Sequence, residues 1–175
     1  NTMARRKLLL GNWKMNHTIA ESKEFCSHSA DMIKLAAEKG IDIGVAPSYL
    51  SLQTVKENAG NMIVAAQDCH FADHGAYTGF VSIPMIKELG IDWCLVGHSE
   101  RRLYAAETSL TCNRKIKALI ENKMTVVYCV GESLADFESG RTKSIVKEQL
   151  LIGLMDIAKE DTDKIVVAYE PVWSI

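Results

Sequence analysis

Short apolar segments alternate with longer segments of helical pattern along the chain, and this alternation constrains the fold more than any other feature. The short segments are rich in β-branched residues and almost continuously apolar. Parallel strands that are covered on both faces have this pattern, whereas a half-exposed strand alternates apolar and polar residues. We therefore predict parallel strands at Lys7–Gly11, Ile41–Ala46, Met62–Ala66, Trp93–Gly97, Thr125–Val130 and Ile165–Tyr169.

Helix start and stop signals lie between the predicted strands. Thr18 and Glu21 have the spacing of a capping box, and Gly40 is placed to end the helix that Thr18 begins. Further helices are predicted by similar signals. One begins at Ser48 or Ser51, and a short one lies between Ser82 and Gly90. A third presents an apolar face at Leu110, Ile116, Leu119 and Ile120. A fourth begins at Thr142, with Ile145, Val146, Leu150, Leu154 and Ile157 facing inward.

The predicted order is a repeated βα unit in which the sixth strand lacks its helix, and no Pro/Gly/Ser-rich linker interrupts it. We expect a single domain over residues 1–175. Two α/β architectures fit, an open doubly wound sheet and a closed (β/α)8 barrel. No G-x-G-x-x-G motif follows a strand, and polar residues follow several different strands. The first observation weakens a dinucleotide-binding fold and the second favours the barrel, of which this chain would supply roughly the first six strands and five helices.

The charge balance argues against two classes of partner. The chain has 20 Lys and Arg against 22 Asp and Glu, a net charge of −2, which is too balanced to predict binding to nucleic acid or to a membrane surface. No apolar run approaches the roughly 18 residues that span a bilayer. The apolar run Leu8–Leu10 is also too short for a signal peptide. We therefore expect a cytoplasmic protein.

The cysteines are odd in number and form no C-x-x-C pair. Reduced, buried thiols explain them better than disulfides or metal ligands. The sequence has no ligand cluster such as H-E-x-x-H, so we expect no metal and no cofactor. Cys129 lies near a strand end, but packing is the simpler explanation for it. The five cysteines are Cys26, Cys69, Cys94, Cys112 and Cys129.

Glu170 is the strongest candidate for a catalytic residue. It follows the predicted strand Ile165–Tyr169 in the sequence Ala-Tyr-Glu-Pro-Val-Trp. A carboxylate just past an apolar strand is partly desolvated, and a barrel enzyme keeps its general base in such a place. Pro171 restricts Glu170 to an extended backbone and ends the strand.

Two other strand ends carry polar side chains. Asn12 and Lys14 form either a solvated turn or, on the same side of an extended strand end, an amide and an ammonium that face an anionic substrate. His98 follows Gly97, and the helical turn that begins at Ser99 would keep its imidazole neutral as a hydrogen-bond donor. The other histidines are more simply explained as ordinary polar residues.

Two features have open interpretations. Arg101 and Arg102 are a charged surface pair, partners of carboxylates or subunit-interface residues. The loop Asp73–Phe80 has two glycines around a small polar tip, and an aromatic residue before and after that tip. A solvated loop is the default interpretation, and the aromatic residues suggest instead a loop that inserts into a partner subunit.

Four motifs together resemble a known family. Gly-Asn-Trp-Lys-Met-Asn, Val-Gly-His-Ser-Glu-Arg-Arg, Cys-Val-Gly-Glu and Ala-Tyr-Glu-Pro-Val-Trp, in this order and spacing, resemble the triosephosphate isomerase family over the whole chain. The resemblance implies a TIM barrel enzyme that interconverts dihydroxyacetone phosphate and glyceraldehyde 3-phosphate through an enediolate, in glycolysis and gluconeogenesis. It implies a small phosphorylated triose as the substrate and no cofactor.

The resemblance also implies the catalytic residues. Asn12 and Lys14 would bind the substrate. His98 would be the electrophile that, with Lys14, stabilises the developing oxyanion. Glu170 would be the base that carries the proton.

Supporting roles are implied for four more residues. Ser99 and Glu100 would support the site, with Glu100 near Lys14. Trp173 would begin the hinge of a flexible lid. The loop at Thr78 would reach into the site of the neighbouring subunit and make a homodimer.

The chain departs from the family pattern at three places. Thr78-Gly79-Phe80 stands where the family usually has Thr-Gly-Glu, Ala105-Ala106-Glu107 where it usually has Phe-Gly-Glu, and Ser174 where it usually has alanine. The first change removes a carboxylate contact between subunits, and the second loosens local packing. None of them touches the proposed acid–base residues.

Length is the larger departure. About 250 residues are usual for a complete barrel. We therefore expect the domain to be C-terminally incomplete, without the last two strands that would supply a phosphate-binding site at a helix N-terminus. An inactive fragment, or a non-catalytic interaction domain of the same fold, is the alternative function. Another phosphate-binding barrel isomerase is a third option, which the pairing of Gly-Asn-Trp-Lys with Glu-Pro-Val-Trp disfavours.

Overall fold

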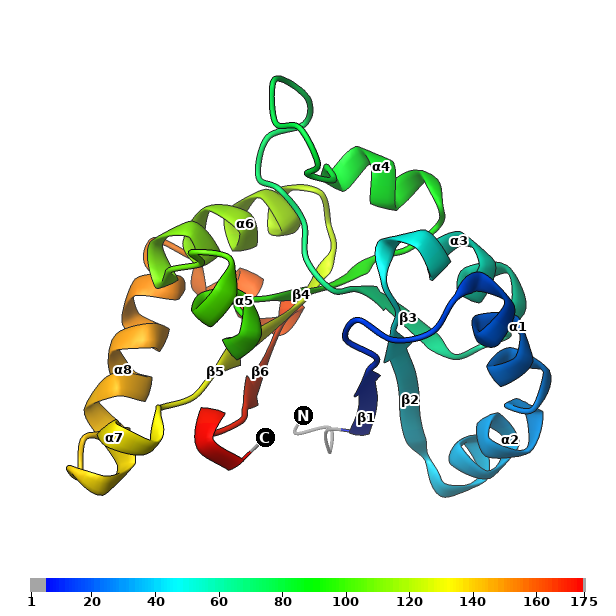
Figure 1. Cartoon of the computed structure of the whole chain (residues 1–175), viewed down its shortest axis with the longest axis horizontal. Coiled ribbons are helices and arrows are strands. Elements are labelled where there is room, and N and C mark those ends of the chain that lie inside the picture. The colour runs from blue at the N-terminus through cyan, green and yellow to red at the C-terminus, as the bar shows by residue number, and fades with distance from the viewer. Residues whose placement is uncertain (1–5, 175) are drawn as a thin grey trace. The chain divides into compact units, whose positions relative to one another are not determined.

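The structure is a computed structural model that describes residues 6–174, and the chain forms two compact units in it (Figure 1). Unit 1 contains residues 6–67 and Met85–Trp93, and unit 2 contains Asp68–Pro84 and residues 94–174. Residues 1–5 and 175 of the predicted domain lie outside the described residues. That the whole chain is a single domain stays a prediction.

Unit 1 contains three strands in the order of the sequence, and neighbouring strands are parallel. β1 pairs with β2 over its whole length, from Lys7 opposite Ile41 to Asn12 opposite Ala46. Helix α1 packs on α3, α2 on β2, and α3 on β3. The elements are β1 (Lys7–Asn12), α1 (Ile19–Ser27), α2 (Ala30–Lys39), β2 (Ile41–Ala46), α3 (Tyr49–Asn58) and β3 (Ile63–Ala66).

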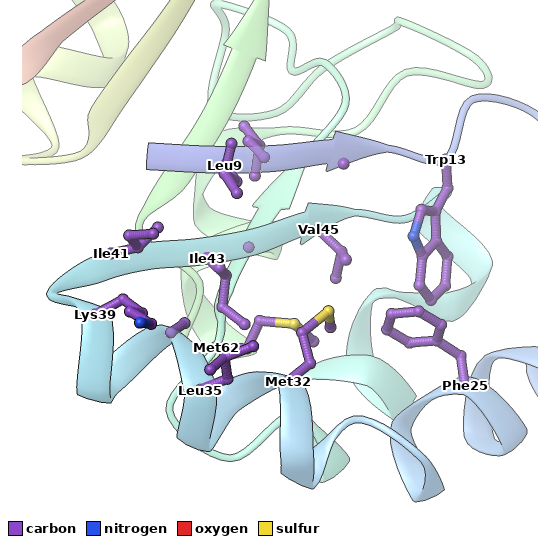
Figure 2. A pocket seen from close by; sticks show the side chains of 14 residues that line it. Leu9, Trp13, Phe25, Met32, Leu35, Lys39, Ile41, Ile43, Val45 and Met62 are labelled. Atoms are coloured by element: carbon purple, nitrogen blue, oxygen red, sulfur yellow. The ribbon is translucent and has the colours of Figure 1, made fainter. Parts of the chain in front are cut away.

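An apolar cavity of about 550 Å³ lies beside the β1–β2 pair of unit 1 (Figure 2). Met32 and Leu35 from α2 reach toward Ile43 on β2 (Figure 2). Trp13 and Phe25 lie at one end of the cavity, with their ring centroids 5.0 Å apart. The side chains surround this space without filling it, and Leu35 is accordingly 55% exposed.

Unit 2 is built around β5 (Thr125–Val130), which has β4 (Trp93–Val96) on one side and β6 (Ile165–Tyr169) on the other. β5 and β6 are parallel and paired from Val126 opposite Ile165 to Val130 opposite Tyr169. Helix α6 packs against both β5 and α8. The other elements of unit 2 are α5 (Ser99–Tyr104), α6 (Ser109–Glu121), α7 (Leu134–Glu138), α8 (Thr142–Gly153) and two 3-10 turns, η1 (Lys159–Lys164) and η2 (Val172–Ser174). Helix α4 (Ile83–Glu88) has its first two residues in unit 2 and the others in unit 1.

The core of unit 2 lies between β5 and its helices. Tyr128 on β5 is fully buried and donates its hydroxyl hydrogen to the carbonyl oxygen of Gln149 at 2.6 Å. Its ring fills the space over Gly153, where a Cβ would overlap the tyrosine hydroxyl. Ile116 and Leu119 on α6 are also fully buried. Each buried side chain of this size stabilises the fold by about 1.5–3 kcal/mol.

The predicted strands and their parallel arrangement are confirmed, with shifts of one residue at three ends. β1 continues to Asn12, β3 begins at Ile63, and β4 ends before Gly97 because Gly97 has a φ of 78°. Such a φ cannot continue a strand. The prediction of reduced, buried cysteines is confirmed, because all five are free and buried. No helix in the described part of the chain is long and apolar enough to cross a membrane.

The described residues contain eight α-helices where roughly five were expected, because the segment Thr18–Gly40 is divided into α1 and α2 and because α5 and α7 lie outside the expected segments. The capping box of Thr18 and Glu21 is present, and Gly40 ends α2 in the left-handed conformation. The segment between them nevertheless breaks at His28, where the Ser27 and Ser29 hydroxyls donate to carbonyl oxygens three residues earlier. Serine competes with helical hydrogen bonds in this way.

The predicted apolar faces also need correction. Leu110 was expected on the inner face of α6, but it is 49% exposed at the start of that helix. The buried positions of α6 are Cys112, Asn113, Lys115, Ile116 and Leu119. In α8 the expected inward residues Ile145, Val146 and Leu150 are only half-buried, and Leu154 and Ile157 lie beyond the end of the helix.

Candidate active site

His98 and Glu170 come together at the ends of the strands of unit 2. His98 follows β4 after Gly97, and Glu170 directly follows β6. The His98 Nε2 atom lies 3.5 Å from the Glu170 Oε2 atom. The His98 side chain is 8% exposed and the Glu170 side chain 50% exposed. A buried imidazole thus faces a half-exposed carboxylate that an incoming molecule can reach.

The hydrogen bonds of His98 indicate which ring nitrogen carries the proton. His98 caps the N-terminus of α5, and its Nδ1 accepts the backbone N–H of Glu100 at 3.1 Å. A backbone N–H can only donate, so Nδ1 is unprotonated and a neutral ring has its hydrogen on Nε2. The Glu100 carboxylate lies farther from Nδ1, at 3.4 Å. The Nε2–H therefore points to the side of the ring where Glu170 lies.

Both side chains line one small cavity. It is lined by backbone of both strand ends and by a few polar side chains. The lining residues are Gly97, His98, Ser99, Arg102, Cys129, Val130, Gly131 and Glu170. Burial, and then the charge of Glu170, raise the pKa of the Cys129 thiol to about 12, so this thiol stays protonated at neutral pH. It does not act as a nucleophile, since the thiolate is the reactive form.

The backbone of Glu170 is fixed by the loop after β5. The Glu170 N–H donates to the Val130 carbonyl oxygen at 2.9 Å. The Glu170 carbonyl oxygen lies where a side chain at Gly131 would begin, so this approach requires glycine. Gln149 holds Gly131 in turn, because its side-chain amide accepts from the Gly131 N–H at 2.9 Å and donates to its carbonyl oxygen at 3.1 Å.

Glu132 is a site residue to which the sequence analysis gave no role. It is fully buried, and its carboxylate accepts hydrogen bonds from the Tyr169 hydroxyl and, at 3.4 Å, from the Trp173 Nε1–H. The bond to Glu132 raises the pKa of the Tyr169 hydroxyl. Trp173 also packs on Phe137, with ring centroids 4.5 Å apart. The residues on both sides of Glu170 are thus tied to one carboxylate.

Asn12 and Lys14 lie in unit 1, at the end of β1. The expectation that Lys14 continues an extended strand end is wrong, because its backbone is left-handed, with a φ of 56°. The Asn12 Oδ1 atom accepts the Lys14 backbone N–H at 2.9 Å, and this local bond turns the chain. The Gln67 amide donates to the carbonyl oxygens of Lys14 and Ala46, each at 2.8 Å. The predicted contact between Lys14 and Glu100, which belongs to unit 2, stays a prediction.

The two neighbouring arginines have different partners. The Arg101 Nε atom lies 3.0 Å from the Asp68 carboxylate, which confirms carboxylate pairing for this residue. Asp68 also pairs with the buried Lys115 at 2.9 Å, and Lys115 pairs with Glu107 at 2.9 Å. Arg102 binds no carboxylate among the described contacts and instead donates to backbone carbonyl oxygens.

The loop at Thr78 has an aromatic base. Thr78 is exposed, and the neighbouring Tyr77 and Phe80 are 42% and 51% exposed. Both rings contact the buried ring of His70, at centroid distances of 4.2 and 4.8 Å. Within the described part of the chain, no three His, Cys, Asp or Glu side chains are close enough together to bind a metal ion.

Comparison with known proteins supplies the family. The family model of triosephosphate isomerase matches residues 7–175. The chain belongs to the triosephosphate isomerase family. This family consists of enzymes with a (β/α)8 barrel, so the predicted fold class is confirmed.

Curated relatives agree with the family match. Triosephosphate isomerase from Clostridium botulinum is 39% identical over 173 residues, which are 98% of this chain and 68% of the relative. Triosephosphate isomerases from Chlorobium phaeobacteroides and Chlorobium chlorochromatii are 43% identical over 176 and 175 residues, with the same coverage. The chain thus spans about two thirds of the length of these relatives.

Two buried thiols make the free energy of unfolding fall at alkaline pH. Burial raises the pKa of Cys112 and Cys129 to about 12, against 9.0 for an ordinary cysteine. Above about pH 9 the unfolded chain loses these protons while the folded chain keeps them, so each thiol lowers the free energy of unfolding by about 1.4 kcal/mol per pH unit. The contribution of the buried thiols is complete below about pH 9 and is lost progressively toward pH 12.

Urea unfolding from pH 7.5 to 11 checks this prediction. We expect the Cys112→Ala, Cys129→Ala double variant to lose stability less steeply than the wild type above about pH 9, with parallel curves below it. The comparison below pH 9 is the control for packing defects that both alanines introduce. Equal slopes above pH 9 would contradict the prediction.

Proposed function

We propose that this protein interconverts dihydroxyacetone phosphate and glyceraldehyde 3-phosphate by moving a proton between neighbouring carbons through an enediolate. The observation that carries the proposal is the 3.5 Å approach of the His98 Nε2 atom to the Glu170 Oε2 atom at one small cavity. Membership of the triosephosphate isomerase family supports it. The reaction would belong to glycolysis and gluconeogenesis in the cytoplasm.

Glu170 is the proposed base. It is half exposed and lies past the end of β6, where a bound triose can present a carbon-bound proton. A positioned base contributes about 10²- to 10⁴-fold in rate, whereas enzymes commonly reach 10⁶-fold or more. Additional groups must therefore stabilise the negative charge that develops on the substrate oxygen.

His98 and Lys14 are the proposed oxyanion-stabilising groups. The Nδ1 of His98 is occupied by the Glu100 N–H, which leaves the Nε2–H to donate to a substrate oxygen. A preorganised donor of this kind contributes about 10²- to 10³-fold. Lys14 supplies a positive charge for the phosphorylated substrate, and Asn12 supports the turn from which Lys14 projects. Ser99 and Glu100 support the site through the first turn of α5.

A second copy of the chain is the macromolecular partner that we propose. The net charge of −2 does not favour binding to nucleic acid or to an anionic membrane. We propose a single barrel domain and a homodimer in which the Thr78 loop contacts the partner. The exposed Tyr77 and Phe80 rings, held from beneath by His70, support this proposal.

Replacing Glu170 by glutamine tests the proposed base. The amide keeps the size of the side chain and removes its basicity, so kcat should fall at least about 10²-fold with an unchanged circular dichroism spectrum. The measurement is a coupled dehydrogenase assay on the 175-residue chain and on a form extended with the remaining third of a relative. Glu148→Gln, an exposed position on α8, is the control. An unchanged kcat in Glu170→Gln would remove Glu170 from this role, and no turnover in either wild-type form would favour the non-catalytic alternative.

Replacing Lys14 by methionine tests the anion-binding role. A hydrogen bond from a charged donor is worth about 1.5–3 kcal/mol, so the affinity for glycerol 3-phosphate should fall roughly 10- to 100-fold. Titration calorimetry at two salt concentrations measures this loss, and the salt dependence of binding should weaken with it. Lys34→Met, an exposed lysine on α2, is the control. Equal affinity and equal salt dependence in Lys14→Met would show that this lysine does not bind the phosphate.

Replacing Phe80 by serine tests the proposed homodimer. Loss of an aromatic side chain that is buried at a subunit contact should raise the dimer dissociation constant at least about tenfold. Sedimentation velocity over a range of concentrations measures this constant. Leu151→Ser removes a 63% exposed apolar side chain on α8 and is the control. A wild-type chain that stays monomeric at all concentrations would overturn the homodimer proposal.

A further inference from the structure

Arg102 binds four groups that come from different parts of unit 2. Its Nε–H donates to the Gly97 carbonyl oxygen at 2.9 Å, and its Nη1 donates to the Ser109 hydroxyl at 3.0 Å. Its Nη2 reaches the Tyr128 hydroxyl at 3.3 Å and the Cys129 carbonyl oxygen at 3.4 Å. The guanidinium also lies over the Tyr128 ring, 5.8 Å from its centroid. A planar fork with fixed donor directions suits such a set of acceptors.

One backbone acceptor directly precedes His98, and the other lies one residue before the strand end to which Glu170 is hydrogen-bonded. The Gly97 carbonyl belongs to the peptide bond that joins Gly97 to His98. The Cys129 carbonyl belongs to the peptide bond before Val130, whose own carbonyl oxygen accepts the Glu170 N–H. Through these contacts one side chain holds the end of β4, which His98 follows, and the end of β5, to which the Glu170 N–H is bonded.

The backbone of Gly97 is in close contact with the same guanidinium. Its φ of 78° is a conformation in which the chain turns from β4 into α5. A Cβ at Gly97 would lie 3.1 Å from the Arg102 Nη2 atom and 2.8 Å from the Cys112 Sγ atom. The absence of a side chain at Gly97 thus gives Arg102 access to the strand end, and the Nε–H bond in turn fixes the direction of the Gly97 carbonyl.

The charge of Arg102 acts at the same cavity. Arg102 lines it together with His98 and Glu170. Both charges act on the Cys129 thiol, because Glu170 raises its pKa and Arg102 lowers it. Each of these two effects on the pKa is smaller than the effect of burial. Arg102 is half-buried, and a positive charge in such a place is less screened than one on the surface.

We propose that Arg102 is a positioning residue for the proton transfer: it holds the strand ends so that His98 Nε2 and Glu170 Oε2 stay at their working separation, and it keeps a positive charge beside them. This inference rests on the proposed function. Arg102 does not touch the reacting atoms in it, and acts through the peptide bonds before His98 and Val130.

Arg101 provides a matched comparison on the same helix. It carries the same guanidinium one residue earlier, but its partner is the Asp68 carboxylate, and it does not line the cavity. Arg101→Gln should therefore leave the His98 ring unchanged, whereas Arg102→Gln should move it.

The experiment compares Arg102→Gln, Arg102→Lys and Arg101→Gln with the wild type. The first readout is the ¹⁵N–¹H spectrum of the His98 imidazole in the 175-residue chain. This spectrum reports the hydrogen bonds of the ring without requiring turnover. The second is the coupled assay in the extended form, with kcat and KM measured separately against pH.

We expect Arg102→Gln to shift the His98 resonances and to lower kcat about 10- to 100-fold, since a misplacement of about 1 Å can reduce a rate about 10²-fold. KM should change less than about threefold because Arg102 does not contact the substrate. The acid limb of the kcat/KM profile should move to higher pH, because loss of a nearby cation favours protonation. Arg102→Lys keeps the charge but not the fork, so it should keep the wild-type acid limb at an intermediate kcat.

Three results would overturn the inference. One is an Arg102→Gln variant with wild-type His98 resonances and wild-type kcat. Another is a loss of kcat that only matches a loss of folded protein. If Arg102→Gln does not fold, an Arg102→Lys variant with full kcat decides against the inference. Failure of the proposed function is separately visible, because it would leave either no turnover in the wild type or a Glu170→Gln variant with wild-type kcat, whatever the Arg102 variants do to the His98 resonances.

Discussion

The parallel pairing of β5 with β6 is the constraint on which the candidate site depends. Paired residues from Val126 with Ile165 to Val130 with Tyr169 bring both strands to an end at the same level. The residue that follows β6 is Glu170, and its N–H continues the ladder by donating to the Val130 carbonyl oxygen. A shift of the pairing by one residue would turn the Glu170 side chain to the opposite face of the sheet, since side chains alternate along a strand. Register therefore decides whether the carboxylate faces His98.

Buried polar contacts beneath the site keep these strand ends in place. Tyr128 is the centre of this arrangement, because its hydroxyl donates to the Gln149 carbonyl oxygen and accepts from Arg102. Gln149 in turn uses its side chain to bind the N–H and the carbonyl oxygen of Gly131. Each of these polar groups has a hydrogen-bond partner within the network, and a buried network without unpaired groups favours one arrangement of the backbone over others. The precision of the site thus comes from residues that never meet a substrate.

Much of this fold could be predicted from the sequence, because the strands are short apolar runs with polar ends. The split between α1 and α2 could not, since it depends on serine hydroxyls that bind the backbone instead of continuing a helical pattern. His98 and Glu170 were accessible to sequence reasoning because each lies just after a strand. Glu132 and Arg102 were not, because their partners lie 37 and 27 residues away along the chain. A glutamate after a glycine at a strand end was the one available signal for Glu132.

The carboxylate of Glu132 has a consequence for how the proposed base can move. Tyr169 precedes Glu170 and Trp173 follows it, and both donate to this same buried acceptor. A displacement of residues 169–173 would remove donors from a fully buried carboxyl group, and leaving a buried acceptor without its partner costs about 1–3 kcal/mol. The buried carboxyl group of Glu132 therefore favours the observed course of residues 169–173, and with it the place of Glu170 beside His98.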